Sequence, residues 1–401
     1  MTTTINNEHK KLNVPNSTDK GNVIRDVPHL RFPEFEGEWE KCKLGDKCDL
    51  LCGYAFDGKN IVEQGTYLLM RGINITEGII RHSSELDRYY TGSVNNLAKY
   101  KLTTGDLVIG MDGSKVGRNS AIVSLTENGS YLVQRVCRIK SCIGNDFIIQ
   151  LVNNHKFHKY VDMVKTSSAI PHISLKDIQN FPIAVPSIQK EADKISRLFH
   201  LLDERIATQN KIIDKLQSLI KGIRNDVFGK LRKNIGFNAV VGDVLDYEQP
   251  QSYIVEDTEY TNEGTPVLTA NKAFVLGYTS ETNGIYGKGD CIIFDDFTLD
   301  CKYVDFPFKV KSSAIKILTA KNKELLRYTF EFLKYLDLSA EEHKRHYIAE
   351  TQNQEIILPT EQMVKTIAHI FSTLSLRMET AVKQRNVFEK QKQYLLRQMF
   401  I

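Results

Sequence analysis

Two segments of the chain carry apolar residues at alternating spacings of four and three, which places these residues on one stripe of a long helix. The first segment spans residues 187–228, and the second spans residues 360–401. A stripe of this period over several heptads is typical of a coiled coil rather than of an ordinary core helix. The principal seam positions are Ile195, Phe199, Leu202, Ile206, Leu216, Ile367, Phe371, Leu374, Met378 and Phe388.

Polar residues interrupt both seams at Gln209, Arg385 and Lys392. Their long side chains can lie at the edge of the seam with the polar end in water. Alternatively, they fix the register of the helix pair at some cost in stability. The sequence leaves both interpretations open. Neither segment contains proline, so both helices are expected to be continuous.

The segments that precede the two helices resemble each other, so the chain repeats once at half its length. Gly45-Asp46 corresponds to Gly242-Asp243 near the start of each half. Further corresponding stretches are 65–69 with 264–268, Gly78 with Gly277, and 105–109 with 289–293. Each half closes with an apolar run that ends in proline. Ser187 and Thr360 follow these prolines as N-cap candidates.

These patterns predict an α+β fold, in which two β-rich mixed domains in pseudo-twofold repeat are separated by two long antiparallel coiled-coil helices. Each helix is roughly 60 Å long at about 1.5 Å per residue. A parallel pair would require residues 229–237 to carry the chain back along that length, which so short a link cannot do. The predicted parts are a loose tail 1–27, a domain 28–186, a helix 187–228, a domain 229–359 and a helix 360–401.

The composition is that of a folded protein with little net charge, since 41% of residues are hydrophobic and the formal charge is +4. This charge is weaker than that of a typical stand-alone nucleic-acid-binding domain. Basic residues are nevertheless concentrated locally, at Lys99, Lys101, Lys115, Arg118, Arg135, Arg138 and Lys140 and again at Lys302, Lys309, Lys311, Lys316, Lys321, Lys323, Lys344 and Arg345. Such clusters are commonly solvated surface, and they indicate phosphate contacts only where the architecture points to nucleic acid.

The cysteines favour a reducing compartment, because there are seven of them at scattered spacing. A cytoplasmic location is therefore expected. The close pairs Cys48/Cys52 and Cys137/Cys142 lack a second pair at zinc spacing, so no metal site is predicted. No apolar run approaches the length of a membrane span, and no secretory signal pattern opens the chain.

Sequence motifs of catalysis are missing from the chain. It contains no phosphate-binding loop, no His-Glu-x-x-His, no Gly-x-Ser-x-Gly and no Asn-Pro-Pro-Tyr/Phe motif of amino-methylating enzymes. Asp295-Asp296 together with Glu331 and Lys334 could suggest a metal-dependent nuclease. An acidic pair in a turn is common, however, and the first half has no counterpart. The chain is therefore interpreted as non-catalytic.

The ordered motifs resemble the specificity subunit of type I restriction–modification systems. The stretches that carry the resemblance are 27–35 with Trp39 and 44–46, then 101–109 with Gly113-Ser114 and Gly117, then 173–186 before the first helix, and 356–359 before the second. The resemblance runs from about Val27 to Ile401. The second half departs from the first where 294–297 replaces the glycine-rich 110–117, which implies that the two domains read different sequences.

The resemblance implies a function for each part of the chain. Each β-rich domain would be a target recognition domain that binds one half of a bipartite asymmetric site in double-stranded DNA. The helices would set the spacer and dock two methyltransferase subunits, which use S-adenosylmethionine to methylate adenine N6. Two restriction–translocation subunits driven by ATP, with Mg, would complete a bacterial or archaeal complex. The chain itself would bind no cofactor and supply no catalytic group.

The residues that read DNA are expected in loops at the rim of each β scaffold, because polar and basic side chains read base edges and hold phosphates. Candidates in the first domain are Arg71, Asn74, Asp112, Ser114, Lys115, Arg118, Thr166, Ser167, Ser168 and His172. Candidates in the second domain are Thr269, Asn271, Lys272, Asp295, Asp296, Lys302, His343, Lys344, Arg345 and Tyr347. For each residue alone, a turn or cap role is an equal interpretation. Asp295 and Asp296 could accept from cytosine N4 or cap a turn.

Two other classes of function compete with DNA reading. A scaffold whose coiled coil holds two protein-interaction domains apart would bind DNA weakly and with little dependence on salt. A specificity subunit would bind in a strongly salt-dependent way and would need both half-sites. A stand-alone modification enzyme would transfer methyl groups as the purified chain, which the missing motifs argue against.

Overall fold

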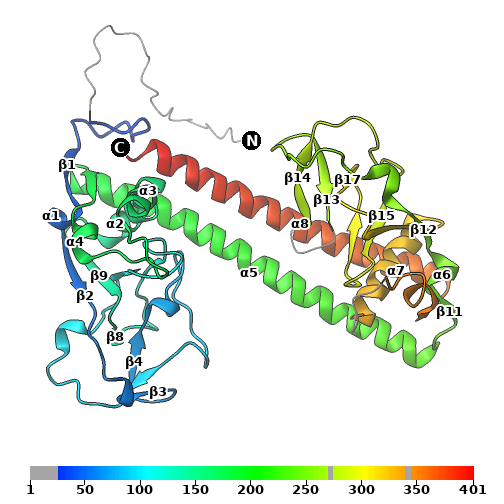
Figure 1. Cartoon of the computed structure of the whole chain (residues 1–401), viewed down its shortest axis with the longest axis horizontal. Coiled ribbons are helices and arrows are strands. Elements are labelled where there is room, and N and C mark those ends of the chain that lie inside the picture. Colours follow the sequence, from blue (N-terminus) through cyan, green and yellow to red (C-terminus); the bar gives the residue numbers. More distant parts are fainter. Residues whose placement is uncertain (1–25, 270–273, 339–344) are drawn as a thin grey trace, which may run out of the picture. The chain divides into compact units, whose positions relative to one another are not determined.

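The computed structural model describes residues 26–269, 274–338 and 345–401 (Figure 1). These residues form two compact units. Unit 1 comprises the described chain up to Ala207 together with Arg385–Ile401, and unit 2 comprises the described residues of Thr208–Gln384. Both units combine short strands with helices, which confirms the α+β class. None of the helices in these ranges is long and apolar enough to cross a membrane.

The expected tail 1–27 lies mostly outside the described residues, of which Asp26 is the first. The carboxylate of Asp26 lies 2.5 Å from the ammonium of Lys41, and its carbonyl accepts the N–H of Trp39 at 2.7 Å. Residue 26, which the sequence assigned to the tail, therefore contacts unit 1.

The strands of unit 1 form two sheets and a separate pair. An antiparallel sheet has the order β2 (Cys48–Cys52), β9 (Val136–Ser141), β6 (Leu107–Gly110) and β7 (Ser120–Ile122). A second sheet has the order β3 (Ile61–Val62), β5 (Tyr89–Tyr90), β4 (Tyr67–Met70) and β8 (Tyr131–Leu132), with β4 and β8 parallel. β1 (Glu40–Lys43) pairs with β10 (Pro182–Val185). The short helices are α1 (Leu44–Lys47), α2 (Asn145–Val152), α3 (His155–Val164) and α4 (Leu175–Gln179), with 3-10 turns at Gly58–Asn60, Gly72–Asn74 and Ala98–Tyr100.

Unit 2 repeats this plan with fewer elements. Its antiparallel sheet has the order β12 (Asp246–Glu248), β18 (Ile315–Thr319), β15 (Cys291–Asp295) and β16 (Cys301–Val304). Its second sheet has the order β14 (Val275–Thr279), β13 (Thr265–Leu268) and β17 (Lys309–Val310), with β13 and β17 parallel. β11 (Ala239–Val240) pairs with β19 (Glu355–Ile356). Short helices are α6 (Val241–Val244) and α7 (Lys323–Leu336), with 3-10 turns at Pro250–Tyr253 and Thr351–Asn353.

The repeat inferred from the sequence therefore extends to sheet topology. The order β12-β18-β15-β16 corresponds to β2-β9-β6-β7, and the parallel pair β13-β17 corresponds to β4-β8. The pair β11-β19 corresponds in the same way to β1-β10. Two scaffolds of the same plan thus carry different loops.

The repeated Gly-Asp turns have the same local cause in both units. The carboxylates of Asp46 and Asp243 each accept the backbone N–H three residues earlier, at 2.8 and 3.0 Å, and so start α1 and α6. Glycine precedes each aspartate because a Cβ there would come within 3.1 Å of Gln179 in unit 1 and within 2.8 Å of Gln352 in unit 2. The close approach of a neighbouring segment thus explains the glycine.

Two local expectations are wrong. Gly78 and Gly277 do not correspond, because Gly78 lies in a turn with φ of 81° whereas Gly277 lies within β14. Ser187 is no N-cap, because its hydroxyl donates to a backbone carbonyl at 2.9 Å instead of accepting from the helix. Thr360 does accept the N–H three residues on, at 3.4 Å, as expected.

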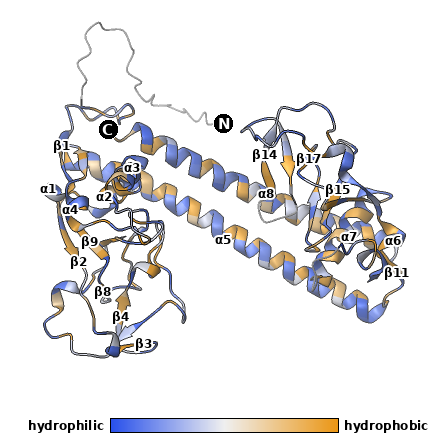
Figure 2. Cartoon of the chain, viewed as in Figure 1, coloured by the Kyte–Doolittle hydropathy of each residue, from blue (hydrophilic) through white to orange (hydrophobic). Residues whose placement is uncertain are grey.

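The two long helices are α5 (Gln189–Asn234) and α8 (Glu361–Gln398). α5 ends at Asn234 rather than at the expected residue 228, so most of the expected link 229–237 is helical. Phe228 and Leu231 are buried on either side of Gly229. Their packing outweighs the low helix propensity of glycine, which costs about 1 kcal/mol. Figure 2 shows apolar and polar residues alternating along both helices.

Within each unit the two helices run antiparallel. In unit 1, Phe199 of α5 packs on Phe400, just beyond α8, with ring centroids 5.8 Å apart. Further along α5, Asp203 pairs with Lys392, which lies earlier in α8, at 2.6 Å. Ascending positions on one helix thus meet descending positions on the other. In unit 2, the later part of α5 and the start of α8 share one hydrophobic cluster, which contains Ile220, Phe228, Val364, Ile367 and Phe371.

Candidate nucleic-acid interface

Four loops of unit 1 converge at one edge of its sheets. The N–H of Val133 donates to the carbonyl of Met70 at 3.1 Å, which joins the β8–β9 turn to the end of β4. Met111 donates its N–H to Arg135 at 2.9 Å and accepts that of Ile173 at 3.0 Å, which adds the β6–β7 loop and the segment before α4. We call this edge rim 1 and define it as residues 71–74, 112–118, 133–135 and 166–172.

Unit 2 repeats the same three bonds. The N–H of Lys311 donates to Leu268 at 3.0 Å, so the β17–β18 turn is held against the end of β13. The N–H of Asp296 donates to Ala314 at 2.9 Å, and its carbonyl accepts the N–H of His346 at 2.9 Å. Rim 2 is defined accordingly as residues 269, 295–298, 311–314 and 345–347. Equivalent backbone contacts therefore present loops of unrelated sequence in the two units.

Two loops of rim 1 that contain candidate residues, 112–118 and 166–172, lie side by side. The N–H of Gly113 donates to the carbonyl of Pro171 at 3.0 Å, and Asp112 forms a β-bridge with His172. The hydroxyl of Thr166 accepts the N–H of His172 at 3.0 Å and lies 3.0 Å from its Nδ1. The polar side chains exposed in these two loops are Ser114, Lys115, Ser167 and Ser168, and Ile170 is also exposed beside them. These two loops of rim 1 thus present hydroxyl groups and a lysine, next to an exposed isoleucine.

Two candidate cations of rim 1 already have carboxylate partners. The ammonium of Lys115 lies 3.1 Å from Glu77, and the guanidinium of Arg118 lies 2.5 Å from Asp162. Hydrogen bonds from Arg118 and Lys165 lower the pKa of Asp162 to about 2, so this carboxylate is charged at neutral pH. Exposed ion pairs of this kind contribute little to stability. Phosphates can therefore replace the carboxylates at small cost.

Asn74 does not reach the surface, which corrects the prediction that its amide contacts bases. Its side chain is buried, and its amide nitrogen donates to the carbonyl of Arg81 at 3.2 Å and to Asp87 at 3.0 Å. Its amide oxygen accepts the N–H of Arg71 at 3.4 Å. Asn74 therefore holds the loop after β4. Arg71 itself is half-buried, with a long contact of 3.5 Å to the carbonyl of Leu86.

Three candidates of the second domain are buried, which corrects their interpretation as base contacts. Asp295 accepts backbone N–H groups two and three residues on, at 2.8 and 3.0 Å, so it caps a turn. Asp296 accepts the N–H of Tyr347 at 2.8 Å and lies 3.4 Å from the buried ammonium of Lys316. The Tyr347 ring is fully buried and packs on Phe294. All three residues hold rim 2 together from inside.

Arg345 is the exposed arginine of rim 2. Its guanidinium lies 3.5 Å from the carbonyl of Ser313 and 3.7 Å from the carboxylate of Asp296, so it covers the β17–β18 turn. Thr269 is half-buried, and its N–H donates to Phe274 at 2.9 Å. The candidates Asn271, Lys272, His343 and Lys344 lie outside the described residues.

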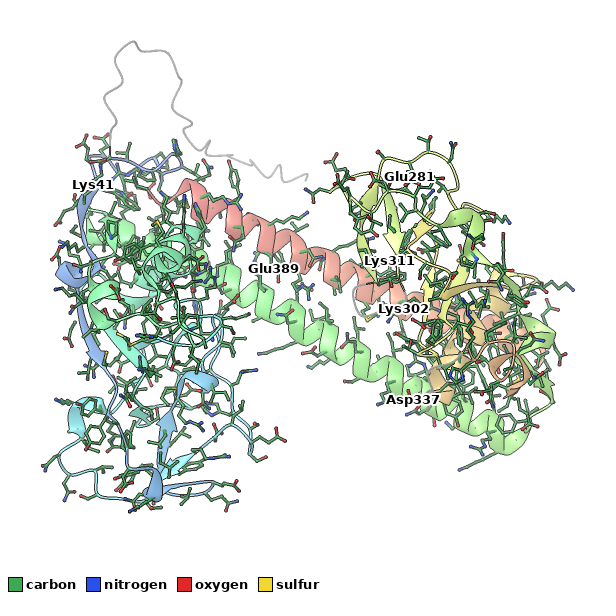
Figure 3. All side chains as sticks on the ribbon, viewed as in Figure 1. Lys41, Glu281, Lys302, Lys311, Asp337 and Glu389 are labelled. Carbon is green, nitrogen blue, oxygen red and sulfur yellow. The ribbon has the colours of Figure 1, made fainter. Side chains whose placement is uncertain are left out.

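Lys302 lies on the helical side of unit 2, so the structure does not bring it together with the candidates of rim 2. It lies 3.2 Å from the carboxylate of Asp300, which also pairs with Lys334 of α7 at 2.5 Å. Lys302 and Lys334 line a cleft of about 750 Å³ between β16, α7 and α8. Figure 3 labels Lys302 on β16 and Lys311 after β17, on different elements of the unit.

The candidate loops inferred from the sequence left out one element of each rim, the turn that follows the parallel edge strand, although its Arg135 and Lys311 stood among the basic residues. Gln134 and Arg135 are exposed, although their neighbours Leu132 and Val136 are completely buried. In unit 2 the corresponding turn is 311–314, where Lys311 is exposed. The available signal is a polar pair that interrupts a run of apolar strand residues.

The rims offer cations and hydrogen-bonding groups. Across the described ranges, no group of three or more His, Cys, Asp or Glu side chains is placed to hold a metal ion.

Burial raises the pKa of the Cys48 thiol to about 11 and that of the Cys291 and Cys301 thiols to about 12, so these thiols are protonated at neutral pH.

A repeated β-rich scaffold that presents polar and basic loops is typical of proteins that read DNA through loops. Residues 36–218 match the family described as type I restriction modification DNA specificity domain. The chain therefore carries a domain of this family. The resemblance to type I specificity subunits that was inferred from the sequence is confirmed.

Two curated relatives are specificity subunits of Escherichia coli. The type I restriction enzyme EcoR124I/EcoR124II specificity subunit is 46% identical over 126 residues, which are 30% of this chain and 31% of that protein. The type I restriction enzyme EcoAI specificity subunit is 29% identical over 186 residues, which are 45% of this chain and 30% of that protein. The matched stretches thus span less than a third of the length of either relative.

A solved structure shares the fold over nearly the whole chain. The S subunit of a type I restriction–modification system from M. genitalium has a TM-score of 0.66 at 15% identity, and the match covers 94% of this chain and 99% of that one. At this identity the likeness concerns the fold, and it confirms two β-rich domains with long helices.

Proposed function

We propose that this chain is the specificity subunit of a type I restriction–modification complex. In this proposal residues 28–186 and 229–359 are two target recognition domains, and each reads one half of a bipartite asymmetric DNA site. Residues 187–228, extended to the observed end of α5 at Asn234, and residues 360–401 are the helices that set the spacer. Adenine methylation and DNA cleavage are then carried out by other subunits.

The observation that carries the proposal is the pair of equivalent rims. Three backbone hydrogen bonds recur at the same places of the two scaffolds, whereas the side chains of the rims differ. This arrangement is suited to reading two different half-sites with one architecture. The scaffold fixes the positions of the loops, and the side chains of the loops determine which bases are recognised. The family match of residues 36–218 supports DNA specificity as the task of the first domain.

The contacts to DNA follow from the surface chemistry of rim 1. Ser114, Ser167 and Ser168 can donate to or accept from base edges and phosphates, while Lys115 and Arg118 can exchange their carboxylate partners for phosphates. In rim 2, Arg345 has the corresponding role. Because phosphate contacts release counterions, binding should weaken steeply as salt increases.

Exposed apolar side chains on the helices support docking of partner subunits there. On α8, Leu376, Val387 and Tyr394 are each about 60% exposed. On α5, Leu201 and Leu219 are nearly half exposed. Single apolar residues are common on helix surfaces, so the assignment of partners to this surface rests mainly on the family match. We assign this surface to two methyltransferase subunits.

The remaining members of the complex follow from the family. S-adenosylmethionine would be bound by the methyltransferase subunits, and ATP with Mg by two restriction–translocation subunits, while this chain would hold no cofactor. Because the complex acts on cellular DNA, we place it in the cytoplasm of a bacterial or archaeal cell.

The test is a map of adenine N6 methylation in the cell that produces this chain with its own partners. Deleting the chain should abolish methylation at one bipartite motif. Replacing residues 28–186 by the matching domain of a relative should change one half of that motif and leave the other half unchanged.

Three results would contradict the proposal. A methylation map that does not change on deletion would favour the scaffold alternative. A change in both half-sites after the exchange would show that the domains do not read separately. Methyl transfer by the purified chain alone would indicate a stand-alone enzyme.

A further inference from the structure

We propose that Arg135, in the turn between β8 and β9, is a specificity-determining residue that reads a guanine in the half-site of the first recognition domain. This inference rests on the proposed function and adds a residue that the loop pattern of the sequence did not single out. Its basis is the exposure of the side chain, its free guanidinium, the conformation of its backbone and the way the turn is anchored.

The guanidinium of Arg135 is available for a ligand. The side chain is exposed, and within the part of the chain that the structure describes it forms no ion pair and no side-chain hydrogen bond. The neighbouring cations differ, because Lys115 pairs with Glu77 and Arg118 with Asp162. Arg135 is thus the cation of rim 1 that does not have to break an ion pair or a side-chain hydrogen bond in order to bind DNA.

The backbone of Arg135 is strained. Its φ is 70°, in the left-handed region that glycine occupies freely and side chains rarely adopt. Among the described residues, it is one of three non-glycine residues with positive φ. A glycine would fit this turn at lower cost, so nothing in the turn itself requires the arginine. Backbone strain of this kind clusters at binding and catalytic sites.

Both sides of the turn are held by the scaffold. The carbonyl of Arg135 accepts the N–H of Met111, the residue that starts the β6–β7 loop, at 2.9 Å. The N–H of Gln134 donates to Tyr54 at 2.8 Å, and Val133 is bonded to the end of β4. The arginine therefore projects from a fixed point between the candidate loops, which reduces the ordering cost of a contact.

A guanine is the ligand that this geometry favours. An arginine on a fixed backbone can donate two parallel hydrogen bonds to guanine O6 and N7, which is the commonest specific contact of the major groove. A phosphate contact needs no fixed direction and is made equally well by flexible lysines. In rim 2 a guanidinium reaches the equivalent turn from another segment, because Arg345 of 345–347 lies 3.5 Å from the carbonyl of Ser313.

The test compares Arg135→Gly with the wild-type chain in its own cells, by mapping the adenine methylation motif with the partner subunits present. Glycine suits the positive φ, so this variant should fold and melt at the same or a higher temperature. We expect one guanine of the half-site assigned to residues 28–186 to become any base. Discrimination at that position should fall by about 10-fold to 100-fold, and the other half-site and the spacer should not change.

Lys176→Ala is the matched control, since Lys176 is an exposed cation of α4 outside rim 1. It should leave the motif as it is. An unchanged motif in Arg135→Gly with uniformly weaker methylation would indicate that Arg135 contacts a phosphate. This result would overturn the inference about guanine and leave the proposed function unaffected. A changed base in the half-site of the second domain would also overturn it. If no methylation depends on the wild-type chain, the proposed function fails as well.

Discussion

His82 joins two loops of unit 1 through two carboxylates. Its Nδ1 lies 3.0 Å from Asp87, and its Nε2 lies 2.9 Å from Glu127. Burial disfavours the charged imidazole, but the hydrogen bonds to Glu127 and Asp87 outweigh burial and raise the pKa of His82 above its ordinary 6.5. Because Asp87 also accepts the amide of Asn74, this cluster supports the loop after β4 in rim 1.

We expect unit 1 to lose stability as pH rises through the raised pKa of His82. The folded pKa lies above the unfolded value, so the contribution of the charged imidazole is complete below the unfolded pKa and is lost as pH rises through the folded one. Urea unfolding followed by the fluorescence of Trp39, the single tryptophan, measures the midpoint across this range. His82→Gln cannot be charged and should give a flatter curve. His155→Gln, an exposed control, should keep the wild-type slope, and an equally steep curve for His82→Gln would disprove the assignment.

Rim residues show where residue-level reasoning from sequence succeeds and where it stops. Ser114 and Lys115 follow a buried strand in a glycine-rich loop and are exposed, as expected. Asp295 ends the equivalent strand, Asp296 follows it, and both are buried. The N–H that Asp296 accepts belongs to Tyr347, far along the chain, so no local pattern could have revealed it. A carboxylate at the end of a strand can face water, contact DNA or cap a turn. Its role depends on contacts with residues that are distant in the sequence.

The long helices are the elements that could be predicted best, because their seams depend on helical period alone. Phe199 and Phe371 are buried at seam positions. The polar interruptions divide between the two interpretations. Lys392 pairs across the helices with Asp203 at 2.6 Å, as a register device would, whereas Arg385 lies 3.7 Å from Glu389 of its own helix, as an edge residue would.

Phe400 anchors the end of α8 in unit 1. Its buried ring lies 5.4 Å from Phe147, 5.8 Å from Phe199 and 6.2 Å from Trp39. Phe400→Ala should lower the free energy of unfolding of unit 1 by about 3–5 kcal/mol, because lost burial and the remaining cavity add. Trp39 lies beside the cavity, so its fluorescence in a denaturant titration reports the shift directly.

Tyr394→Ala is the control for this prediction, since Tyr394 lies on the same helix and is 60% exposed. Its removal should change the free energy of unfolding by no more than about 0.5 kcal/mol. Equal losses for the two variants would mean that the end of α8 is not anchored through Phe400.

At the scale of the molecule, each unit is completed by a helix from the other half of the chain. Unit 1 includes Arg385–Ile401, and unit 2 includes α5 from Thr208 onward. Phe400 packs on Phe199 in unit 1 as Phe228 packs on Phe371 in unit 2. A cut between the two halves of the sequence would therefore remove part of each core.

The repeat was readable because short motifs recur in the same order, but the sheet topology was not. The parallel strand β8 contains two residues, Tyr131 and Leu132, and a segment so short has no detectable period. Its partner β4 lies far earlier in the chain. Pairing between such segments depends on the whole fold, which local patterns do not encode.

The spacer of the DNA site should follow the length of the helix pair. Four residues inserted between Ala207 and Thr208, with four more between Gln384 and Arg385, lie where each helix passes from one unit to the other. Each insertion adds about 6 Å of helix. We expect the methylated motif to keep both half-sites and to gain about one to two base pairs of spacer, at roughly 3.4 Å for each pair.

Insertion into α5 alone distinguishes a rigid helix pair that sets the spacer length from a flexible connection between the units. Asp203 must still meet Lys392 in unit 1, and Phe228 must still meet Phe371 in unit 2. Both contacts survive when the two helices lengthen together, whereas a single insertion forces one of them out of register and should lower the denaturation midpoint. An unchanged spacer in the doubly extended chain, with both half-sites still methylated, would show that the helices do not set the distance. A longer spacer with an altered half-site would instead mean that the insertion disturbs a rim, because the bases recognised in each half-site should depend on the rim loops alone.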